Sequence, residues 1–287
     1  MTAPADFDPR LTPARPDLAA TYLKGKVEAA RFVEGVTMRV TAPRAPLRKH
    51  PAPDAPLDTE ALHGERVVVY ETTEEGWCWG QLELDSYVGW IPASALGPQG
   101  KEPTHRVAAL RTLVFAGPNI KRPPLMALPF LSRLVIIRQD GEFAVTDEGG
   151  YVSASHLVPI DSFDRDFVAT ARRFMGAPYL WGGRTNLGLD CSGLVQISLQ
   201  AAGYACPRDS DMQAGLGSPI DLNEGLDALR ARDLVYWKGH IGIVSEPGRL
   251  LHANGFHMAV AEEPLAEAVK RIRNSGSAVL AARRVDQ

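Results

Sequence analysis

The apolar residues follow two different patterns along the chain. From about residue 35 to residue 159, short runs rich in Val, Ile, Tyr and Trp alternate with Gly, Pro and Asp, as in the segments 66–70, 77–82 and 134–137. Runs of this length at close spacing predict β-strands that assemble into small barrels. The first part of the chain is therefore expected to consist of such barrels.

After residue 161 the spacing becomes that of helices followed by strands. Apolar residues recur on one helical face over 163–175 and again over 191–202, where Gly203 ends the pattern. Strands are expected at 233–237, 241–245 and 250–253, then a helix at 264–272 and a last strand at 278–284. Helices followed by a sheet in this order predict an α+β domain.

One stretch of the β-rich part occurs twice. The sequence Tyr-Val-Gly-Trp-Ile-Pro-Ala-Ser-Ala-Leu at 87–96 is echoed by Gly-Tyr-Val-Ser-Ala-Ser-His-Leu at 150–157. A turn and an apolar strand precede each copy in the same order. The repeat predicts two copies of one unit of roughly 60 residues.

Together these patterns predict four parts. They are an N-terminal arm at 1–34, a first barrel at 35–100, a second barrel at 101–160 and the α+β domain at 161–287. The arm begins with several prolines, and a partial apolar stripe over 17–32 predicts a short helix that lies on the rest of the protein.

Composition and charge exclude several classes of protein. The net charge is −3, without a long run of one sign, which argues against nucleic-acid binding through a basic surface. No apolar stretch is long enough to cross a membrane, and the N-terminal segment lacks the apolar core of a signal peptide. The three cysteines have no framework or CxxC spacing, so reduced thiols, a cytoplasmic location and no structural metal are expected. No cofactor is expected, and the oligomeric state is left open.

A candidate nucleophile stands at the start of the second helix of the α+β domain. Cys191 follows Asp190, which is expected to cap the helix. A helix N-terminus favours a thiolate and lowers the pKa of a cysteine, and the thiolate is the nucleophilic form. Glycines at 182, 183, 188 and 193 predict a backbone that a peptide substrate can approach closely.

Two histidines are candidate partners of this cysteine. His240 opens a predicted strand and points away from the face of Ile241 and Ile243, which suits a base that faces a cleft. His252 lies near it if the two strands pair as a hairpin through 246–249. A second imidazole there can accept the N–H of the first ring and fix its tautomer.

The motifs around these residues resemble those of the NlpC/P60 cysteine peptidases. They are Pro-Tyr-Leu-Trp-Gly-Gly at 178–183, Leu-Asp-Cys-Ser-Gly-Leu-Val at 189–195, Gly-His-Ile-Gly-Ile at 239–243 and Leu-His-Ala at 251–253. The repeated stretch at 87–96 resembles the closing segment of bacterial SH3 (SH3b) domains. The resemblance implies an α+β, papain-like catalytic domain preceded by two SH3b barrels. One departure is Ala-Arg-Asp at 231–233, where the family has Pro-Gly-Asp.

The resemblance also implies roles for individual residues. Cys191 would be the nucleophile, His240 the general base and His252 the orienting residue, with Tyr179 and the backbone of 190–192 at the oxyanion site. Two SH3b domains without a secretion signal look like the γ-D-glutamyl-L-diamino acid endopeptidases that recycle murein peptides of the type L-Ala-γ-D-Glu-diamino acid. Positions that match their substrate contacts in the catalytic domain are Tyr179, Trp181, Asp190, Ser192 and Ser210.

In that group the first SH3b domain binds the free amine of the terminal L-Ala through a tyrosine and a carboxylate. Tyr87 matches the tyrosine, and Asp58 is the candidate carboxylate, with Asp54 and Glu60 as alternatives. Other functions stay open: an NlpC/P60 amidase or acyltransferase of other specificity, or a non-catalytic wall-binding protein. A metal site made of Cys191, His240 and His252 is a further interpretation. The third peptide residue, diaminopimelate or lysine, is also open.

Overall fold

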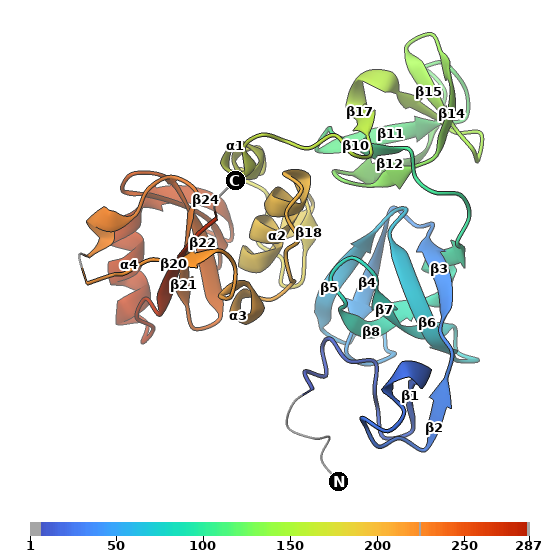
Figure 1. Ribbon diagram of the computed structural model, residues 1–287. Helices are drawn as coiled ribbons and strands as arrows, with labels where there is room; N and C mark the ends of the chain where they lie inside the picture. Colours follow the sequence, from blue (N-terminus) through green and yellow to red (C-terminus); the bar gives the residue numbers. More distant parts are fainter. Residues whose placement is uncertain (1–6, 224, 286–287) are drawn as a thin grey trace. The chain divides into compact units, whose positions relative to one another are not determined.

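The computed structural model describes residues 7–223 and 225–285. The chain divides into two compact units, Met1–Ser162 and Phe163–Gln287. Every α-helix of the described residues belongs to the second unit, whereas the first is built of strands and single 3₁₀ turns (Figure 1).

The segment that opens the described chain is not a helix. Strand β1 (Leu18–Ala20) pairs in parallel with β2 (Arg31–Val33), and only Thr21–Leu23 forms a 3₁₀ turn between them. The helix predicted over 17–32 is wrong. Leu18 is fully buried through strand pairing and packs with Trp79 and Trp90, and Gly25 takes a φ of +80°, which a continuous helix does not allow.

Seven strands form the first sheet, in the order β5-β4-β8-β7-β6-β3-β9. Their bounds are β3 (Val36–Val40), β4 (Arg44–Arg48), β5 (Leu57–Leu62), β6 (Arg66–Thr72), β7 (Trp77–Leu82), β8 (Val88–Pro92) and β9 (Leu96–Pro98). The strands predicted at 66–70 and 77–82 are confirmed. A 3₁₀ turn, Ala93–Ala95, precedes the last strand.

The next strands follow the same order, divided between two sheets, β12-β11-β16-β15-β14 and β13-β10-β17. Their bounds are β10 (His105–Val107), β11 (Arg111–Phe115), β12 (Pro124–Pro129), β13 (Arg133–Leu134), β14 (Ile136–Asp140), β15 (Phe143–Thr146), β16 (Tyr151–Ser153) and β17 (Leu157–Pro159). A 3₁₀ turn, Ala154–His156, again precedes the last strand. The strand expected at 134–137 is interrupted at Val135, between β13 and β14.

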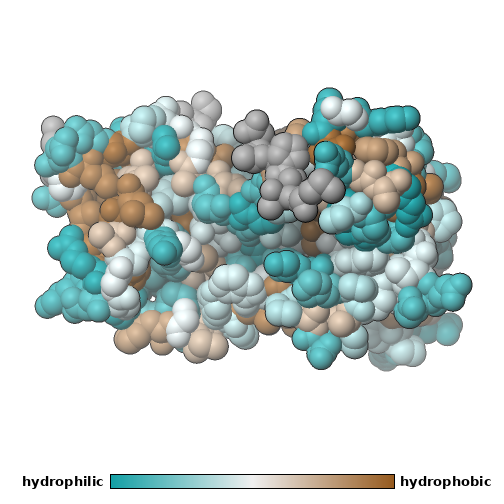
Figure 2. Space-filling view, turned by 90° about the horizontal axis from the view of Figure 1, so that it is seen from below, coloured by the Kyte–Doolittle hydropathy of each residue, from teal (hydrophilic) through white to brown (hydrophobic). Residues whose placement is uncertain are grey.

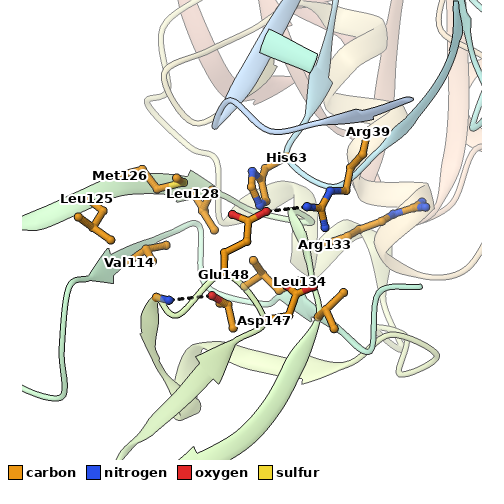
Figure 3. A pocket seen from close by; sticks show the side chains of 13 residues that line it. Arg39, His63, Val114, Leu125, Met126, Leu128, Arg133, Leu134, Asp147 and Glu148 are labelled. Carbon is orange, nitrogen blue, oxygen red and sulfur yellow. Dashed lines mark hydrogen bonds and ion pairs between the residues drawn. The ribbon is translucent and has the colours of Figure 1, made fainter. Parts of the chain in front are cut away.

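Within the first unit these two sets of strands touch. Arg39 forms an ion pair with Glu148 at 2.6 Å, and the N–H of Arg133 donates to the carbonyl of His63 at 2.8 Å. Figure 3 shows these side chains around a pocket of about 80 Å³, which Leu134 also lines. Polar contacts thus join the two sets of strands around a small pocket with both polar and apolar walls.

The second unit combines helices with a six-stranded antiparallel sheet (Figure 1). The order is β20 (Ser218–Pro219), β25 (Ala281–Arg284), β21 (Asp233–Trp237), β22 (His240–Glu246), β23 (Arg249–Asn254) and β24 (Ala259–Pro264). The helices are α1 (Phe167–Arg172), α2 (Cys191–Ala201), α3 (Ser210–Gln213) and α4 (Leu265–Asn274), and a small ribbon pairs β18 (Arg184–Thr185) with β19 (Gly188–Leu189). The strands predicted at 233–237, 241–245 and 250–253 are confirmed.

Helix α1 is shorter than the pattern over 163–175 predicted. Asp166 caps it by accepting the N–H of Val168, so the helix begins at Phe167. Phe163, which was expected on the buried face, is 54% exposed. After Arg172 the backbone bonds span three residues instead of four, which ends the helix.

The turn that departs from the family pattern is also unusual in geometry. Arg232 has a φ of +81°, a left-handed conformation that glycine adopts without strain. Its guanidinium lies 5.0 Å from the ring centre of Phe167, and this cation–π contact offsets part of the strain. The turn still leads into β21 at Asp233.

On the face shown in Figure 2, polar and apolar side chains are interspersed. Among residues 7–223 and 225–285, no helix has the length and apolar character needed to cross a membrane.

Candidate active site

Cys191 is the first residue of α2 and is 6% exposed. The backbone N–H groups of Ile241, in β22, and of Ser192 interact with its sulfur. Because Ile241 follows His240 directly, this contact brings the sulfur to the start of the strand that carries the histidine. The hydroxyl of Tyr179 is near enough for the charge on Cys191 to affect it: burial, together with this charge, raises the pKa of Tyr179.

The start of α2 is held by a buried carboxylate. Asp190 caps the helix by accepting the N–H of Gly193 at 2.6 Å, and its other oxygen accepts the N–H of Gly182 at 2.8 Å. Fully buried Arg208 donates to both oxygens of Asp190, at 3.0 and 2.7 Å, and to the hydroxyl of Ser192 at 2.8 Å. The predicted substrate contacts of Asp190 and Ser192 stay predictions, and both side chains are anchored inside the protein.

The glycines around the cysteine have a role other than the predicted one. A Cβ on Gly193 would lie 2.2 Å from the carbonyl oxygen of Gly183, and one on Gly183 would lie 2.3 Å from that of Gly188. These positions let the protein's own backbone segments approach one another. The interpretation that they make room for substrate is therefore corrected at Gly183, Gly188 and Gly193, where the space is already filled.

The two histidines are hydrogen-bonded, as the predicted hairpin requires. Strands β22 and β23 pair in antiparallel fashion, and Nε2 of His240 lies 2.8 Å from Nδ1 of His252. His252 is 1% exposed, and its Nε2 lies 2.7 Å from Oε1 of Glu263. Arg271 of α4 in turn donates to both oxygens of Glu263, each at 2.5 Å. Neither Glu263 nor Arg271 was predicted from the sequence.

Burial dominates the pKa values of the central pair. It raises the pKa of the Cys191 thiol to about 12, helped by the charge of Asp190 and opposed by the N–H groups of Ile241 and Ser192. It lowers the pKa of His240 to about 3, with His252 and Arg271 acting in the same direction. The expectation of a lowered cysteine pKa is therefore wrong, because desolvation outweighs the helix N-terminus. Both shifts favour the neutral forms, a thiol at Cys191 and an uncharged imidazole at His240.

This charge state predicts the pH profile of thiol alkylation. We expect the rate at which iodoacetamide modifies Cys191 to rise about tenfold per pH unit from pH 6 to 9, since only the thiolate reacts. Peptide mass spectrometry of the modified site measures the rate, and the unfolded protein, whose thiol has an ordinary pKa, is the control. A thiolate–imidazolium pair would instead give a rate that does not change with pH across this range.

A groove of about 320 Å³ opens beside the histidines. Its walls include His240, His252, Phe256 and Arg271, and Phe256 is 69% exposed. Arg271 stacks over the Phe256 ring at 4.3 Å. A substrate that reaches His240 thus finds both an apolar and a cationic surface next to it.

The other predicted contacts of the second unit lie around the start of α2. Tyr179 pairs with Leu189 in an isolated β-bridge, which ties it to the segment before the cysteine. Trp181 is 65% exposed. Ser210 is the first residue of α3, whose Gln213 donates to the carbonyl of Ser192 at 3.0 Å.

The two predicted amine contacts lie in the first unit. Tyr87 is 5% exposed and directly precedes β8, and its N–H donates to Asp85 at 3.1 Å. Asp58 lies in β5 and is partly exposed. Of the alternatives, Glu60 is fully buried and forms an ion pair with Arg44. The roles of Tyr87 and Asp58 stay predictions.

Within the described part of the chain, one group of side chains has atoms close enough to share a metal ion. The ligand atoms of His252, His257 and Glu263 lie within 4.8 Å of one another. Arg271 already occupies both oxygens of Glu263. A cation there would have to displace a guanidinium, so the group fits an ion-pair network better than a metal site.

Comparison with known sequences identifies both parts of the chain. Residues 176–274 match the NlpC/P60 family, and residues 47–96 match the bacterial dipeptidyl-peptidase Sh3 domain. The chain is 30% identical over 228 residues to a γ-D-glutamyl-L-lysine dipeptidyl-peptidase of Bacillus subtilis, an alignment that covers 70% of this chain and 73% of the relative. It is 24% identical to the protein of that name from Bacillus cereus, over 73% of this chain and 71% of the relative.

Comparison with solved structures agrees on the fold. An NlpC/P60 family protein from Bacillus cereus superimposes with a TM-score of 0.72 at 20% sequence identity, covering 86% of this chain and 99% of the other. This similarity extends through both units, and the B. subtilis relative is matched over more than two thirds of its length. The chain therefore belongs to the NlpC/P60 family of peptidases, with an SH3 domain of the bacterial dipeptidyl-peptidase type in front of the peptidase domain.

Proposed function

We propose that this peptidase hydrolyses the bond between γ-D-glutamate and the diamino acid in free murein peptides that begin with L-Ala. Murein peptide recycling is the process that would use this reaction. The observation that carries the proposal is the similarity to γ-D-glutamyl-L-lysine dipeptidyl-peptidases over most of both chains, SH3 domain included. The hydrogen-bonded histidines beside a buried cysteine supply the chemistry.

The first step is the attack of Cys191 on the γ-carbonyl carbon of D-glutamate. His240 accepts the thiol proton as the sulfur–carbon bond forms, because both groups are neutral before the substrate reacts. The negative charge that develops on the carbonyl oxygen is stabilised by backbone N–H groups at the start of α2. One such hydrogen-bond donor typically lowers the activation free energy by about 3 kcal/mol.

The second step expels the diamino acid. His240 gives its proton to the leaving nitrogen as the carbon–nitrogen bond breaks, which leaves a thioester on Cys191. The leaving amine must reach His240, so we assign the diamino acid to the groove that Phe256 and Arg271 line. Water then attacks the thioester while His240 takes its proton, and the thiol returns with release of L-Ala-D-Glu.

The first SH3 domain would confine the enzyme to short peptides. Tyr87 and Asp58 are the candidates for binding the free amine of L-Ala, a contact that intact murein does not offer. We also propose that residues 101–160 are a second, divergent SH3b barrel and serve as a spacer. The recurring strand order and the second 3₁₀ turn support this assignment.

Mass spectrometry of reaction products tests the proposal. The substrates are L-Ala-γ-D-Glu-diaminopimelate, the same peptide with lysine in third position, and each peptide with an acetylated N-terminus. We expect L-Ala-D-Glu and free diamino acid from the free-amine peptides. Acetylation should lower kcat/KM at least tenfold, because it removes a hydrogen bond to a charged amine, whose loss costs about 1.5 kcal/mol or more of binding free energy.

Each other outcome has a distinct meaning. Cleavage of the acetylated peptides at the same rate leaves the peptidase assignment intact but removes the amine contact. A new amide or ester in place of free diamino acid identifies an acyltransferase. If none of the four peptides is cut by protein whose Cys191 still alkylates, the proposed bond is wrong.

A further inference from the structure

An acidic side chain, that of Glu263, extends the hydrogen-bonded pair of His240 and His252. The chain of contacts runs from His240 through His252 to Glu263, with distances of 2.8 and 2.7 Å, and ends at Arg271. Glu263 is 8% exposed and His252 1% exposed. Burying polar side chains costs free energy unless every hydrogen-bond donor meets an acceptor. The positions of the hydrogens in this array are therefore restricted.

The array determines which nitrogen of His252 carries the hydrogen. A carboxylate only accepts hydrogen bonds, so Nε2 of His252, facing Glu263, must be the donor. Hydrogen bonds from Arg271 and His252 overcome the effect of burial and lower the pKa of Glu263 to about 2, which keeps it a carboxylate at neutral pH. Burial lowers the pKa of His252, so its ring is neutral and has one N–H only. Nδ1 of His252 is then an acceptor.

The tautomer of His240 follows from that of His252. Since Nδ1 of His252 accepts, Nε2 of His240 must donate across the 2.8 Å contact. His240 is neutral as well, because burial lowers its pKa to about 3. Its Nδ1 is therefore the only ring nitrogen with a free lone pair. A general base needs that lone pair to take the thiol proton from Cys191.

We propose that Glu263, held by Arg271, is a positioning residue that sets the tautomers of both histidines and so keeps Nδ1 of His240 ready to accept the Cys191 proton. The inference rests on the proposed function only in that it supposes thiol catalysis. Arg271 supplies the restraint: its two ion-pair contacts fix the carboxylate, and its stacking on Phe256 fixes the guanidinium. His257, whose Nδ1 lies 4.0 Å from Glu263, is the other titratable group that faces this carboxylate.

The variant Glu263→Gln tests this at constant size. An amide both donates and accepts, so Gln can face Nε2 of His252 with its NH₂ group and favour the opposite tautomer. The matched control is Glu262→Gln, on the same strand, which loses a partly exposed ion pair with Arg172. We expect E263Q to lower kcat by about 10- to 100-fold with KM nearly unchanged, by analogy with the loss of the outer hydrogen-bond partner of a metal-bound histidine. E262Q should match the wild type.

Histidine ¹⁵N–¹H NMR gives the readout that a merely structural role would not change. In the wild type we expect hydrogens on Nε2 of both His240 and His252, and in E263Q a mixture that includes Nδ1–H forms. Hydrogen on Nδ1 of either ring in the wild type would overturn the proposal, whether or not the variant folds. Unchanged tautomers and kcat in folded E263Q would do the same. If the wild type cuts no murein peptide but its tautomers are as expected and shift in E263Q, the proposed substrate fails and the positioning role stands.

Discussion

The variant Cys191→Ala is expected to lose about 10⁴-fold or more in kcat/KM, since no other group can form the acyl intermediate. The fold should persist because alanine is a good residue for the first turn of α2, and the cap from Asp190 to the N–H of Gly193 does not involve the cysteine side chain. Steady-state hydrolysis of L-Ala-γ-D-Glu-diaminopimelate measures the loss, and circular dichroism checks the fold.

The two other cysteines are matched controls. Cys78 and Cys206 are also buried and reduced, at 2% and 5% exposure, but Cys78 lies in β7 of the first unit and Cys206 lies beyond the end of α2. Cys78→Ala and Cys206→Ala should therefore keep most of the activity. Turnover by C191A that approaches the wild type would exclude covalent catalysis at this residue.

Local sequence signals were sufficient to find Cys191 and two of the three residues in the hydrogen-bonded array of His240, His252 and Glu263. Cys191 stands after a capping aspartate, and His240 and His252 lie in strands whose short connecting turn implies a hairpin. Glu263 was missed because its contact depends on the register of β23 against β24. His252 faces Ala261 across this pair, so Glu263, two residues further on, is its diagonal neighbour. No local pattern specifies that register.

Predictions made from local sequence patterns were wrong where tertiary contacts determine the structure. The stripe over 17–32 has helical spacing, yet Leu18 is buried by the pairing of β1 with β2 and by Trp79 and Trp90, while Tyr22 is 57% exposed. The pKa of Cys191 depends on burial by β22, which is 50 residues away in the sequence, and this burial opposes the helix terminus. Strands such as Trp77–Leu82 and Asp233–Trp237 were predicted accurately because each is an uninterrupted run bounded by turn residues.

The variant Arg208→Met is expected to destabilise the second unit by about 3–5 kcal/mol, the usual cost of leaving one charge of a buried pair alone. Arg208 is fully buried and donates to Asp190 and Ser192, and methionine fills similar space without replacing any of these hydrogen bonds. Urea unfolding of each variant measures the change in the free energy of unfolding.

Two control variants distinguish the cost of an unpaired buried charge from the cost of losing any arginine side chain. Arg172→Met removes an ion pair with Glu262 in which Arg172 is 41% exposed, and it should cost at most about 1 kcal/mol. The double variant Asp190→Asn with Arg208→Met removes both buried charges together, so it should be more stable than R208M alone, although the cap of α2 is weakened. Equal costs for R208M and R172M would contradict the idea that this pair holds the start of α2, and with it the position of Cys191.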